Sequence, residues 1–267
     1  MGLLDGRVLV TGATGGIGRA IARAFASRGA ELVLSGRRRE VLDSVAAELG
    51  ARAIPADLAD RAELERLAAA ARPIDVLVAN AALPSTGLLE QLSQAQIDDM
   101  LEINLRAPVA LARALVPEMI ERQSGHVVFI SSLSGRVASS HGSLYAATKF
   151  GLRGFALGLR QDLRRHGIGV SVVLPGFISD SGMWADAGLK LPPGVGTRTP
   201  EQVAEAVLRA IERNRPEVDV APAALRLGAR LGSVAPGLAA TVQRLSGGEQ
   251  LASALASAQR DKLPHDG

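Results

Sequence analysis

Short runs of apolar and β-branched residues alternate along the chain with longer stretches in which apolar residues recur at helical spacing. Several short runs are apolar at consecutive positions, as in Val8-Leu9-Val10 and Val76-Leu77-Val78. Such runs are typical of strands buried on both faces of a parallel sheet. The pattern predicts strands at Arg7–Thr11, Glu31–Ser35, Arg52–Ala56, Asp75–Ala79, His126–Ser131, Gly169–Leu174 and Glu217–Val220, with helices near 17–29, 38–49, 60–71, 93–122, 143–166 and 200–213.

This alternation predicts an α/β fold, a Rossmann-like doubly wound parallel sheet of about seven strands with helices on both faces. A length of 267 residues suits one such domain. Residues 221–267 are rich in Ala, Leu, Gly and Arg. We therefore expect them to form a helical C-terminal appendage of the same domain. Ligands of such a sheet bind at the carboxyl ends of its strands.

The composition narrows the classes of site. Aromatic residues make up only 3% of the chain, so Ala, Val, Leu and Ile must build the core. The absence of cysteine excludes disulfides, thiolate catalysis and cysteine-ligated metals, and the four histidines are too dispersed to predict a metal site. We see no signal peptide at the start and no membrane span. We expect a cytoplasmic location.

The charge distribution does not predict nucleic-acid binding. The formal net charge is only +3, and Arg37-Arg38-Arg39 is the one tight basic cluster. A nucleic-acid-binding protein would normally carry a longer basic stripe interleaved with aromatic residues. A local phosphate site is the better interpretation of this cluster.

A glycine-rich segment joins the first predicted strand to the first predicted helix. In Thr11-Gly12-Ala13-Thr14-Gly15-Gly16-Ile17-Gly18, Gly12 permits the tight turn, Gly16 lets the backbone approach a pyrophosphate, and Gly18 lets helix and strand pack closely. Glycine-rich loops are common, but this position between strand and helix makes the signal strong. We expect contacts to a dinucleotide from Gly12, Thr14, Gly15, Gly16, Ile17 and Gly18.

The end of the second predicted strand indicates which cofactor binds. It reads Leu34-Ser35-Gly36-Arg37-Arg38, with no carboxylate to bind a free ribose 2′-hydroxyl. Ser35, Arg37 and Arg38 instead offer a hydroxyl and cations suited to a 2′-phosphate. The alternative is a solvated arginine run at a helix start, a position where arginine opposes the helix dipole. We favour NADP(H) over NAD(H).

A tyrosine and a lysine are four residues apart in Tyr145-Ala-Ala-Thr-Lys149, and therefore lie on one face of a predicted helix. Phenol has a reference pKa of about 10. A nearby ammonium and a bound nicotinamide would stabilise the phenolate and lower this pKa toward the working range. Such a pair is common by chance, so its surroundings must decide its meaning. Ser132 lies thirteen residues before Tyr145, at the end of a predicted strand.

These elements, together with Asn80, Asn104 and Pro175-Gly176, occur in an order and spacing that resembles the short-chain dehydrogenase/reductase family in its single-domain branch. The resemblance spans residues 7 to about 213. It implies that Tyr145 is the general acid/base, that Lys149 holds the nicotinamide ribose and lowers the tyrosine pKa, and that Ser132 bonds the substrate oxygen. Asn104 would support a water-linked proton path. Residues 1–220 would form the dinucleotide-binding and catalytic domain.

The resemblance also implies a set of cofactor contacts beyond the glycine-rich loop. They are Asp57 and Leu58 after the third strand, Asn80 and Ala81 after the fourth, Pro175, Gly176 and Ile178 after the sixth, and Tyr145 and Lys149 themselves. Two positions depart from the family pattern. The usual Asn-Asn-Ala-Gly reads Ala79-Asn80-Ala81-Ala82, and Gly15 stands where some NADP-using relatives carry a basic residue. The second departure leaves Arg37 as the main support for NADP(H).

We therefore expect an NADP(H)-dependent oxidoreductase that interconverts an alcohol and a ketone or aldehyde. The alternatives are a catalytically idle cofactor-sensing protein and a sugar-nucleotide epimerase or dehydratase, which usually needs a longer substrate domain. An apolar lid around Met183, Trp184, Leu189 and Leu191 favours an apolar substrate. The family's four-helix interface, near 106–122 and 143–166, implies a homodimer or homotetramer.

Overall fold

The computed structural model describes residues 2–84, 87–180, 188, 196–245 and 248–259. Its centre is a seven-stranded parallel sheet in the order β3-β2-β1-β4-β5-β6-β7. The strands are β1 (Arg7–Thr11), β2 (Glu31–Gly36), β3 (Arg52–Pro55), β4 (Val76–Ala79), β5 (His126–Ile130), β6 (Gly169–Pro175) and β7 (Glu217–Val220). All seven predicted strands are present, and their ends differ from the prediction by one residue at most. The predicted fold class is confirmed.

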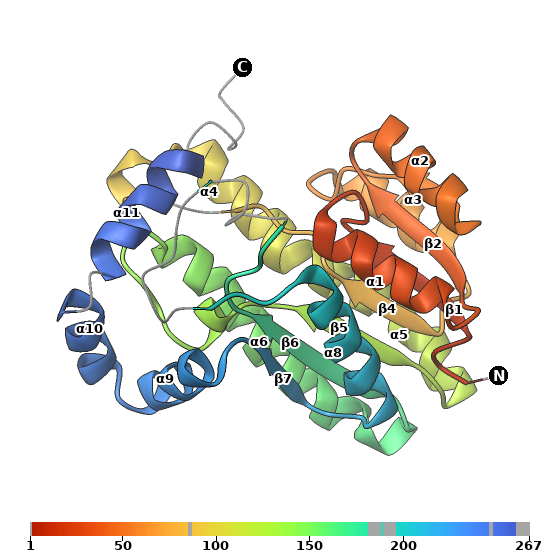
Figure 1. Cartoon of the computed structure of the whole chain (residues 1–267). Helices are drawn as coiled ribbons and strands as arrows, with labels where there is room; N and C mark the ends of the chain where they lie inside the picture. Colours follow the sequence, from red (N-terminus) through yellow and green to blue (C-terminus); the bar gives the residue numbers. More distant parts are fainter. Residues whose placement is uncertain (1, 85–86, 181–187, 189–195, 246–247, 260–267) are drawn as a thin grey trace.

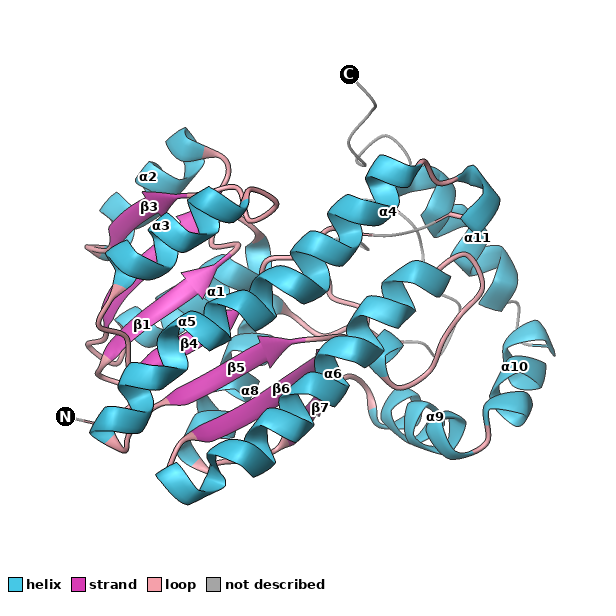
Figure 2. Ribbon diagram, turned by 180° about the vertical axis from the view of Figure 1, so that it is seen from behind, coloured by secondary structure: helices cyan, strands magenta, loops and turns pink. Residues whose placement is uncertain are grey.

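Helices cover both faces of the sheet (Figures 1 and 2). One apolar cluster joins the strands to α1 (Gly16–Ala26), α2 (Arg39–Leu49) and α8 (Pro200–Glu212). A second cluster joins them to α3 (Arg61–Ala71), α5 (Ala107–Arg122) and α6 (Ser143–Leu163). Because successive strand residues point to opposite faces, Val8 and Val10 enter the first cluster while Leu9 enters the second. This two-sided burial explains the uninterrupted apolar runs in the sequence.

The helix predicted over 93–122 is present from Gln94 to Arg122, but it is not α-helical throughout. It consists of α4 (Gln94–Leu101), a π-helical segment η2 (Glu102–Arg106) and α5. The first part starts at a capping box between Ser93 and Gln96. A π-helical turn contains one extra residue and often occurs at functional sites, and here it carries the buried Asn104. Sequence periodicity did not reveal this interruption.

The tail beyond β7 forms α9 (Ala223–Val234), α10 (Pro236–Leu245) and α11 (Gly248–Gln259). Figure 1 shows these helices at the side of the molecule away from α2 and α3. Consecutive members pack on one another, and Arg230 of α9 donates from Nε to the Asp219 carboxylate at 2.8 Å. No described helix is long and apolar enough to cross a lipid bilayer.

Candidate active site

The glycine-rich loop lies where the strand order reverses, between β1 and its neighbours β2 and β4. Gly12 has φ +66°, and a Cβ there would lie 2.8 Å from Ala81 Cα. A Cβ at Gly18 would lie 2.2 Å from the carbonyl oxygen of Gly12. Both glycines are therefore required by close backbone contacts. Gly15 is the N-cap residue of α1 and offers no side chain to cap the first amides, which leaves them available to an anion.

Asn80 fastens this loop to the end of β4. Its Nδ2 donates to the Thr11 carbonyl at 3.0 Å and to the Gly12 carbonyl at 3.3 Å. The backbone amides of Asn80 and Ala81 donate to Thr11 Oγ1 at 3.1 and 3.2 Å. Thr11 was not predicted to have a role, and it fixes the spacing between the two strand ends. Asn80 and Ala81 thus lie beside the loop, and their contact with the cofactor stays a prediction.

The three polar residues after β2 occupy different environments. Ser35 is 1% exposed, and its hydroxyl has no hydrogen-bond partner among the described residues. Arg38 donates from Nη2 to the Thr14 carbonyl at 2.9 Å, so it supports the glycine-rich loop. Arg37 is exposed, and no hydrogen bond or ion pair joins it to another described residue. Of the two arginines assigned to a 2′-phosphate, Arg37 is therefore the one whose guanidinium is not engaged.

Residues after β3 also lie at this edge of the sheet. The Asp57 carboxylate accepts a hydrogen bond from the Ala59 amide at 3.0 Å, and the Asp57 amide donates to Glu63 at 2.7 Å. Leu58 is 7% exposed. The turn is thus ordered by its own side chains, and one Asp57 oxygen has no bond to a described residue. This geometry is compatible with the predicted contact to adenine.

Ser132, Tyr145 and Lys149 come together at the carboxyl end of β5. Tyr145 and Lys149 lie one turn apart on α6, and Nζ of Lys149 is 5.5 Å from the centre of the tyrosine ring. The same ammonium donates to the Ile130 carbonyl at 3.2 Å. Ser132 caps the short 3-10 helix η3 (Leu133–Gly135) by accepting from the Ser134 amide at 3.1 Å. The spacing predicted from the sequence therefore corresponds to one compact group.

Burial is the largest cause of the pKa shifts of Tyr145 and Lys149. It raises the pKa of Tyr145 to about 12, while the hydrogen bond with Ser132 lowers that pKa by less. Burial lowers the pKa of Lys149 to about 8, so its side chain is mainly a cation at neutral pH. In the chain alone, loss of hydration thus outweighs the predicted lowering of the tyrosine pKa. Positive charge from a bound cofactor would have to lower the pKa of Tyr145 further.

Asn104 and the residues after β6 complete the edge. Asn104 is 1% exposed; its Oδ1 accepts from the Leu83 amide at 2.7 Å, and its Nδ2 donates to the Leu83 carbonyl at 3.0 Å. It therefore anchors the segment that follows Asn80. Pro175 ends β6, and a Cβ at Gly176 would lie 3.0 Å from Ala221 and 3.2 Å from Leu133. Ile178 pairs in parallel with Arg198. The predicted lid residues Met183, Trp184, Leu189 and Leu191 lie outside the described residues.

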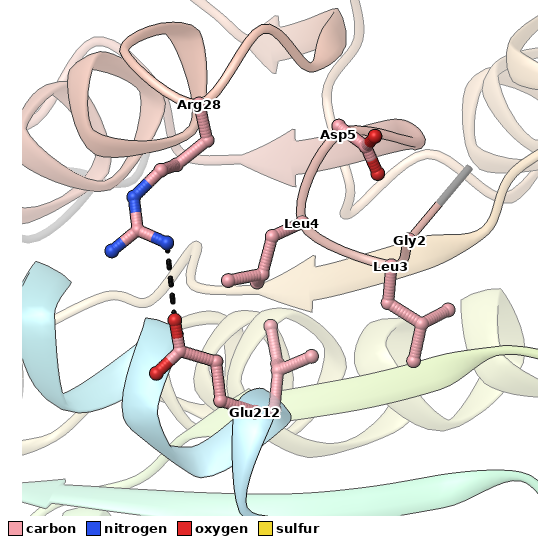
Figure 3. A pocket seen from close by; sticks show the side chains of 7 residues that line it. Gly2, Leu3, Leu4, Asp5, Arg28 and Glu212 are labelled. Atoms are coloured by element: carbon pink, nitrogen blue, oxygen red, sulfur yellow. Dashed lines mark hydrogen bonds and ion pairs between the residues drawn. The ribbon is translucent and has the colours of Figure 1, made fainter.

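A cavity of about 490 Å³ lies far from this edge, at the amino end of the sheet (Figure 3). It is lined by the segment before β1 and by the ends of α1 and α8, and an ion pair between Arg28 and Glu212 at 3.1 Å crosses it. Ligands of doubly wound sheets bind at the opposite, carboxyl edge. This cavity is therefore not the site that holds Tyr145. No group of three or more metal-ligating side chains is placed to bind a metal among the described residues.

Comparison with known proteins matches this arrangement. The sequence model of the short chain dehydrogenase family matches residues 7–191. The chain belongs to the short-chain dehydrogenase/reductase family. It is 39% identical over 222 residues to the ketoacyl reductase HetN of Nostoc, covering 80% of this chain and 77% of the relative. It is 37% identical to the NADP-dependent 3-hydroxy acid dehydrogenase YdfG of Salmonella typhi, covering 75% of this chain and 86% of the relative.

A solved structure agrees with the fold. A short-chain dehydrogenase from Sphingobium yanoikuyae, in complex with NADPH, superposes with a TM-score of 0.76 at 31% identity, covering 87% of this chain and 94% of the other. The resemblance inferred from the motifs is thus confirmed, and so is the expectation of an oxidoreductase.

Proposed function

We propose that this chain is an NADP(H)-dependent oxidoreductase that interconverts an alcohol and a ketone or aldehyde, with Tyr145 as the general acid/base. The observation that supports this most directly is the grouping of Ser132, Tyr145 and Lys149 at the carboxyl end of β5. This group lies at the same edge of the sheet as the glycine-rich loop. One similar structure is a complex with NADPH, and one relative is named an NADP-dependent dehydrogenase. Both support the choice of cofactor.

The residues present fit a dinucleotide. Gly12 and Gly18 allow the tight backbone contacts that shape the loop, the first amides of α1 lack a side-chain cap, and the Arg37 guanidinium is exposed. Arg37 would contact the 2′-phosphate, while Arg38 holds the loop through the Thr14 carbonyl and the Ser35 side chain is buried. When bound, the nicotinamide supplies or accepts the hydride.

In the direction of reduction, negative charge develops on the carbonyl oxygen of the substrate. The Ser132 hydroxyl donates a hydrogen bond to this oxygen, and Tyr145 transfers its phenolic proton to it, which yields the alcohol. The Lys149 cation then stabilises the phenolate. Oxidation runs the same steps in reverse, with the tyrosinate accepting the hydroxyl proton. Asn104 holds the neighbouring backbone through Leu83, which keeps the edge of the site in place.

A direct assay tests this function. Nicotinamide absorbance is followed with NADPH and a panel of apolar ketones and aldehydes, to which ketoacyl thioesters are added because a relative is named a ketoacyl reductase. Secondary alcohols and 3-hydroxy acids with NADP⁺ test the reverse direction, after the name of a second relative. Turnover that Tyr145→Phe removes supports the proposal. Tight NADPH binding without turnover on the whole panel would instead favour a cofactor-sensing protein.

We also propose a homodimer or homotetramer that assembles through α5 and α6. The exposed side of α6 carries Phe150, which is 40% exposed, and Gly154 and Gly158, which have no neighbouring atom within Cβ reach. Small and apolar residues of this kind allow close helix packing across a two-fold axis. Light scattering at micromolar concentration should give the mass of two or four chains. A monomeric mass would contradict this assembly.

A further inference from the structure

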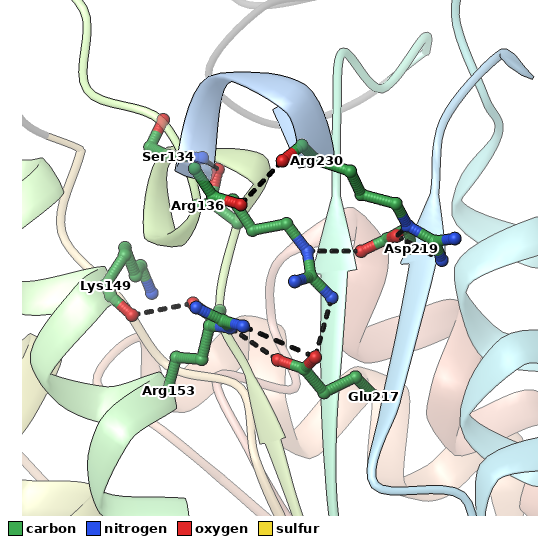
Figure 4. Close-up of polar contacts among 10 residues, drawn as sticks. Ser134, Arg136, Lys149, Arg153, Glu217, Asp219 and Arg230 are labelled. Atoms are coloured by element: carbon green, nitrogen blue, oxygen red, sulfur yellow. Dashed lines mark hydrogen bonds and ion pairs between the residues drawn. The ribbon is translucent and has the colours of Figure 1, made fainter. Parts of the chain in front are cut away.

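A network of ion pairs joins the end of η3 to β7, α6 and α9 (Figure 4). Arg136 follows η3, and its side chain is only 8% exposed. Its Nε donates to Asp219 Oδ1 and its Nη2 donates to Glu217 Oε2, both at 2.8 Å. Glu217 and Asp219 are two residues apart on β7, so their carboxylates point to the same face of the sheet. Arg136 thus bridges two carboxylates of the edge strand.

Two more arginines reach the same carboxylates from other elements. Arg153 of α6 donates from Nε to Glu217, and Arg230 of α9 pairs with Asp219 at 2.8 Å. Their side chains are 23% and 62% exposed. Arg136 is therefore the buried member, and a planar guanidinium is suited to bridging two carboxylates in a fixed geometry. Each carboxylate keeps a second arginine if Arg136 is replaced.

The segment that ends at Arg136 begins at the proposed catalytic serine. Immediately before this segment, the Ser131 hydroxyl donates to the Lys149 carbonyl at 3.0 Å. A Cβ at Gly135 would lie 2.8 Å from that same carbonyl oxygen. The segment therefore rests directly on the turn of α6 that carries Lys149. Its two ends are set by β5 at one side and by the Arg136 ion pairs at the other.

We propose that Arg136 is a positioning residue, whose ion pairs with Glu217 and Asp219 hold Ser132 against Tyr145. This inference rests on the proposed function for the meaning of Ser132 and Tyr145, but not for the contacts themselves. A small displacement of a positioned group lowers turnover strongly even when no reacting atom is removed. The role differs from general stabilisation because it predicts a local change at Tyr145.

The chain offers a spectroscopic readout for that local change, because Tyr145 is its only tyrosine. Replacing tyrosine by 3-fluorotyrosine gives one fluorine resonance that reports the ring and its titration. The hydrogen bond with Ser132 lowers the pKa of Tyr145, and the nearby cation is Lys149. In Arg136→Met we expect the resonance to shift or broaden and its titration midpoint to move to higher pH. Arg136→Lys, which keeps one charge but not the bridge, should fall between parent and Arg136→Met.

Arg209→Met provides the matched control, because it removes an arginine from an exposed pair with Glu205 on α8. This variant should leave the resonance, the titration and the turnover as in the parent. In Arg136→Met, kcat should fall about tenfold to a hundredfold, while the NADPH dissociation constant stays within about twofold, since the phosphate loop is distant from the network. Circular dichroism and a thermal scan establish that each variant is folded.

The positioning role is overturned if Arg136→Met gives the parental resonance and titration, or if Arg209→Met shifts both equally. It is also overturned if Arg136→Lys and Arg136→Met lose only thermal stability, with kcat and the resonance as in the parent. A parent that turns over no substrate on the panel would count against the proposed function alone. In that case the fluorine measurement still decides whether Arg136 positions Tyr145.

Discussion

The two halves of the sheet both contribute residues to its carboxyl edge, but different kinds of contact position those residues. The cofactor half, β1–β3 with their loops, is shaped by backbone contacts, such as the close approach of Gly18 to Gly12. The catalytic half, β4–β7 with α6, is shaped by charged side chains far apart in sequence, such as Arg136 and Asp219, which are separated by 83 residues. The first half should therefore be sensitive to side-chain size, and the second to charge and hydrogen bonding.

The largest effect should come from Tyr145→Phe in the catalytic half. In the proposed mechanism Tyr145 donates the proton for reduction and phenylalanine cannot, so turnover should be abolished while the NADPH dissociation constant stays near that of the parent. Steady-state kinetics and fluorescence titration with NADPH measure the two quantities. Retention of more than about a tenth of the parental kcat, equivalent to about 1.4 kcal/mol in the barrier, would contradict the assignment. Lys149→Ala should damage both quantities, because its side chain serves both halves.

A size change should act mainly on the cofactor half. In Gly18→Ala the added methyl would lie 2.2 Å from the Gly12 carbonyl oxygen, and the loop must move to relieve this contact. Forced repacking of this kind costs about 1–3 kcal/mol. We expect weaker binding of both NADPH and NADH, measured by fluorescence titration, together with a lower melting temperature. Gly228→Ala on α9 is the control, since no atom lies within 4 Å of its added methyl and binding of both cofactors should stay as in the parent.

A charge change within the cofactor half tests which arginine reads the 2′-phosphate. Loss of a charge-assisted hydrogen bond of about 1.5–3 kcal/mol predicts that Arg37→Ala weakens NADPH about tenfold to a hundredfold and leaves NADH nearly unchanged. Arg38→Ala should instead weaken both, because Arg38 supports the Thr14 carbonyl. Arg39→Ala is a surface control. The comparison needs dissociation constants at one ionic strength. Equal losses for both cofactors in Arg37→Ala, or a parent that prefers NADH, would refute the role of Arg37.

The last prediction concerns His126 in the catalytic half. It should change the free energy of unfolding with pH without changing activity. Burial, followed by the charge of Arg160, lowers the pKa of His126 to about 4, below its ordinary value of 6.5. The unfolded chain therefore binds more protons between these values, and the free energy of unfolding should fall as pH drops from about 6.5 toward 4. At pH 5 the expected loss is about 2 kcal/mol.

Denaturant unfolding at several pH values measures this loss. His126→Asn should show a shallower decline below pH 6.5 than the parent, whereas His166→Asn, at the less buried His166, should keep the parental slope. Identical slopes in all three chains would contradict the role of His126. Because His126 lies at the amino end of β5, bonded to Ser171 at 2.8 Å, we expect no change in the kinetic pH profile.

The sequence predicted the cofactor half well because its signals are local. Strand, loop and helix follow one another from Arg7 to Ala26, so spacing alone positions the glycines. The structure refined one group there. Ser35 and Arg38 were predicted to complete a 2′-phosphate site supported mainly by Arg37, but strand alternation buries Ser35 and the Arg38 side chain bonds to the Thr14 carbonyl of the loop. Their directions depend on packing that residue type does not encode.

The catalytic half was only partly predictable. Ser132, Tyr145 and Lys149 were found from their spacing, because a strand end and one helical turn fix it. The arginine network was missed, although Glu217-Val218-Asp219-Val220 held a signal. Its alternation predicts one acidic face on a strand, and its burial between helices requires partners for both carboxylates. Nothing in the sequence names Arg136, Arg153 and Arg230 as these partners, since they come from a turn and two helices.

The sequence by itself determined the family, the parallel sheet, the glycine-rich loop between β1 and α1, and the spacing of Ser132, Tyr145 and Lys149, because backbone periodicity and short spacings act within a few residues. Only the tertiary structure decided the π-helical break at Asn104, the burial that raises the pKa of Tyr145, and the ion pairs behind Ser132. The ion pairs in particular depend on strand register and helix docking, which bring together side chains more than 60 residues apart. The Tyr145 side chain loses its hydration, and its pKa rises, only when the folded elements pack around it.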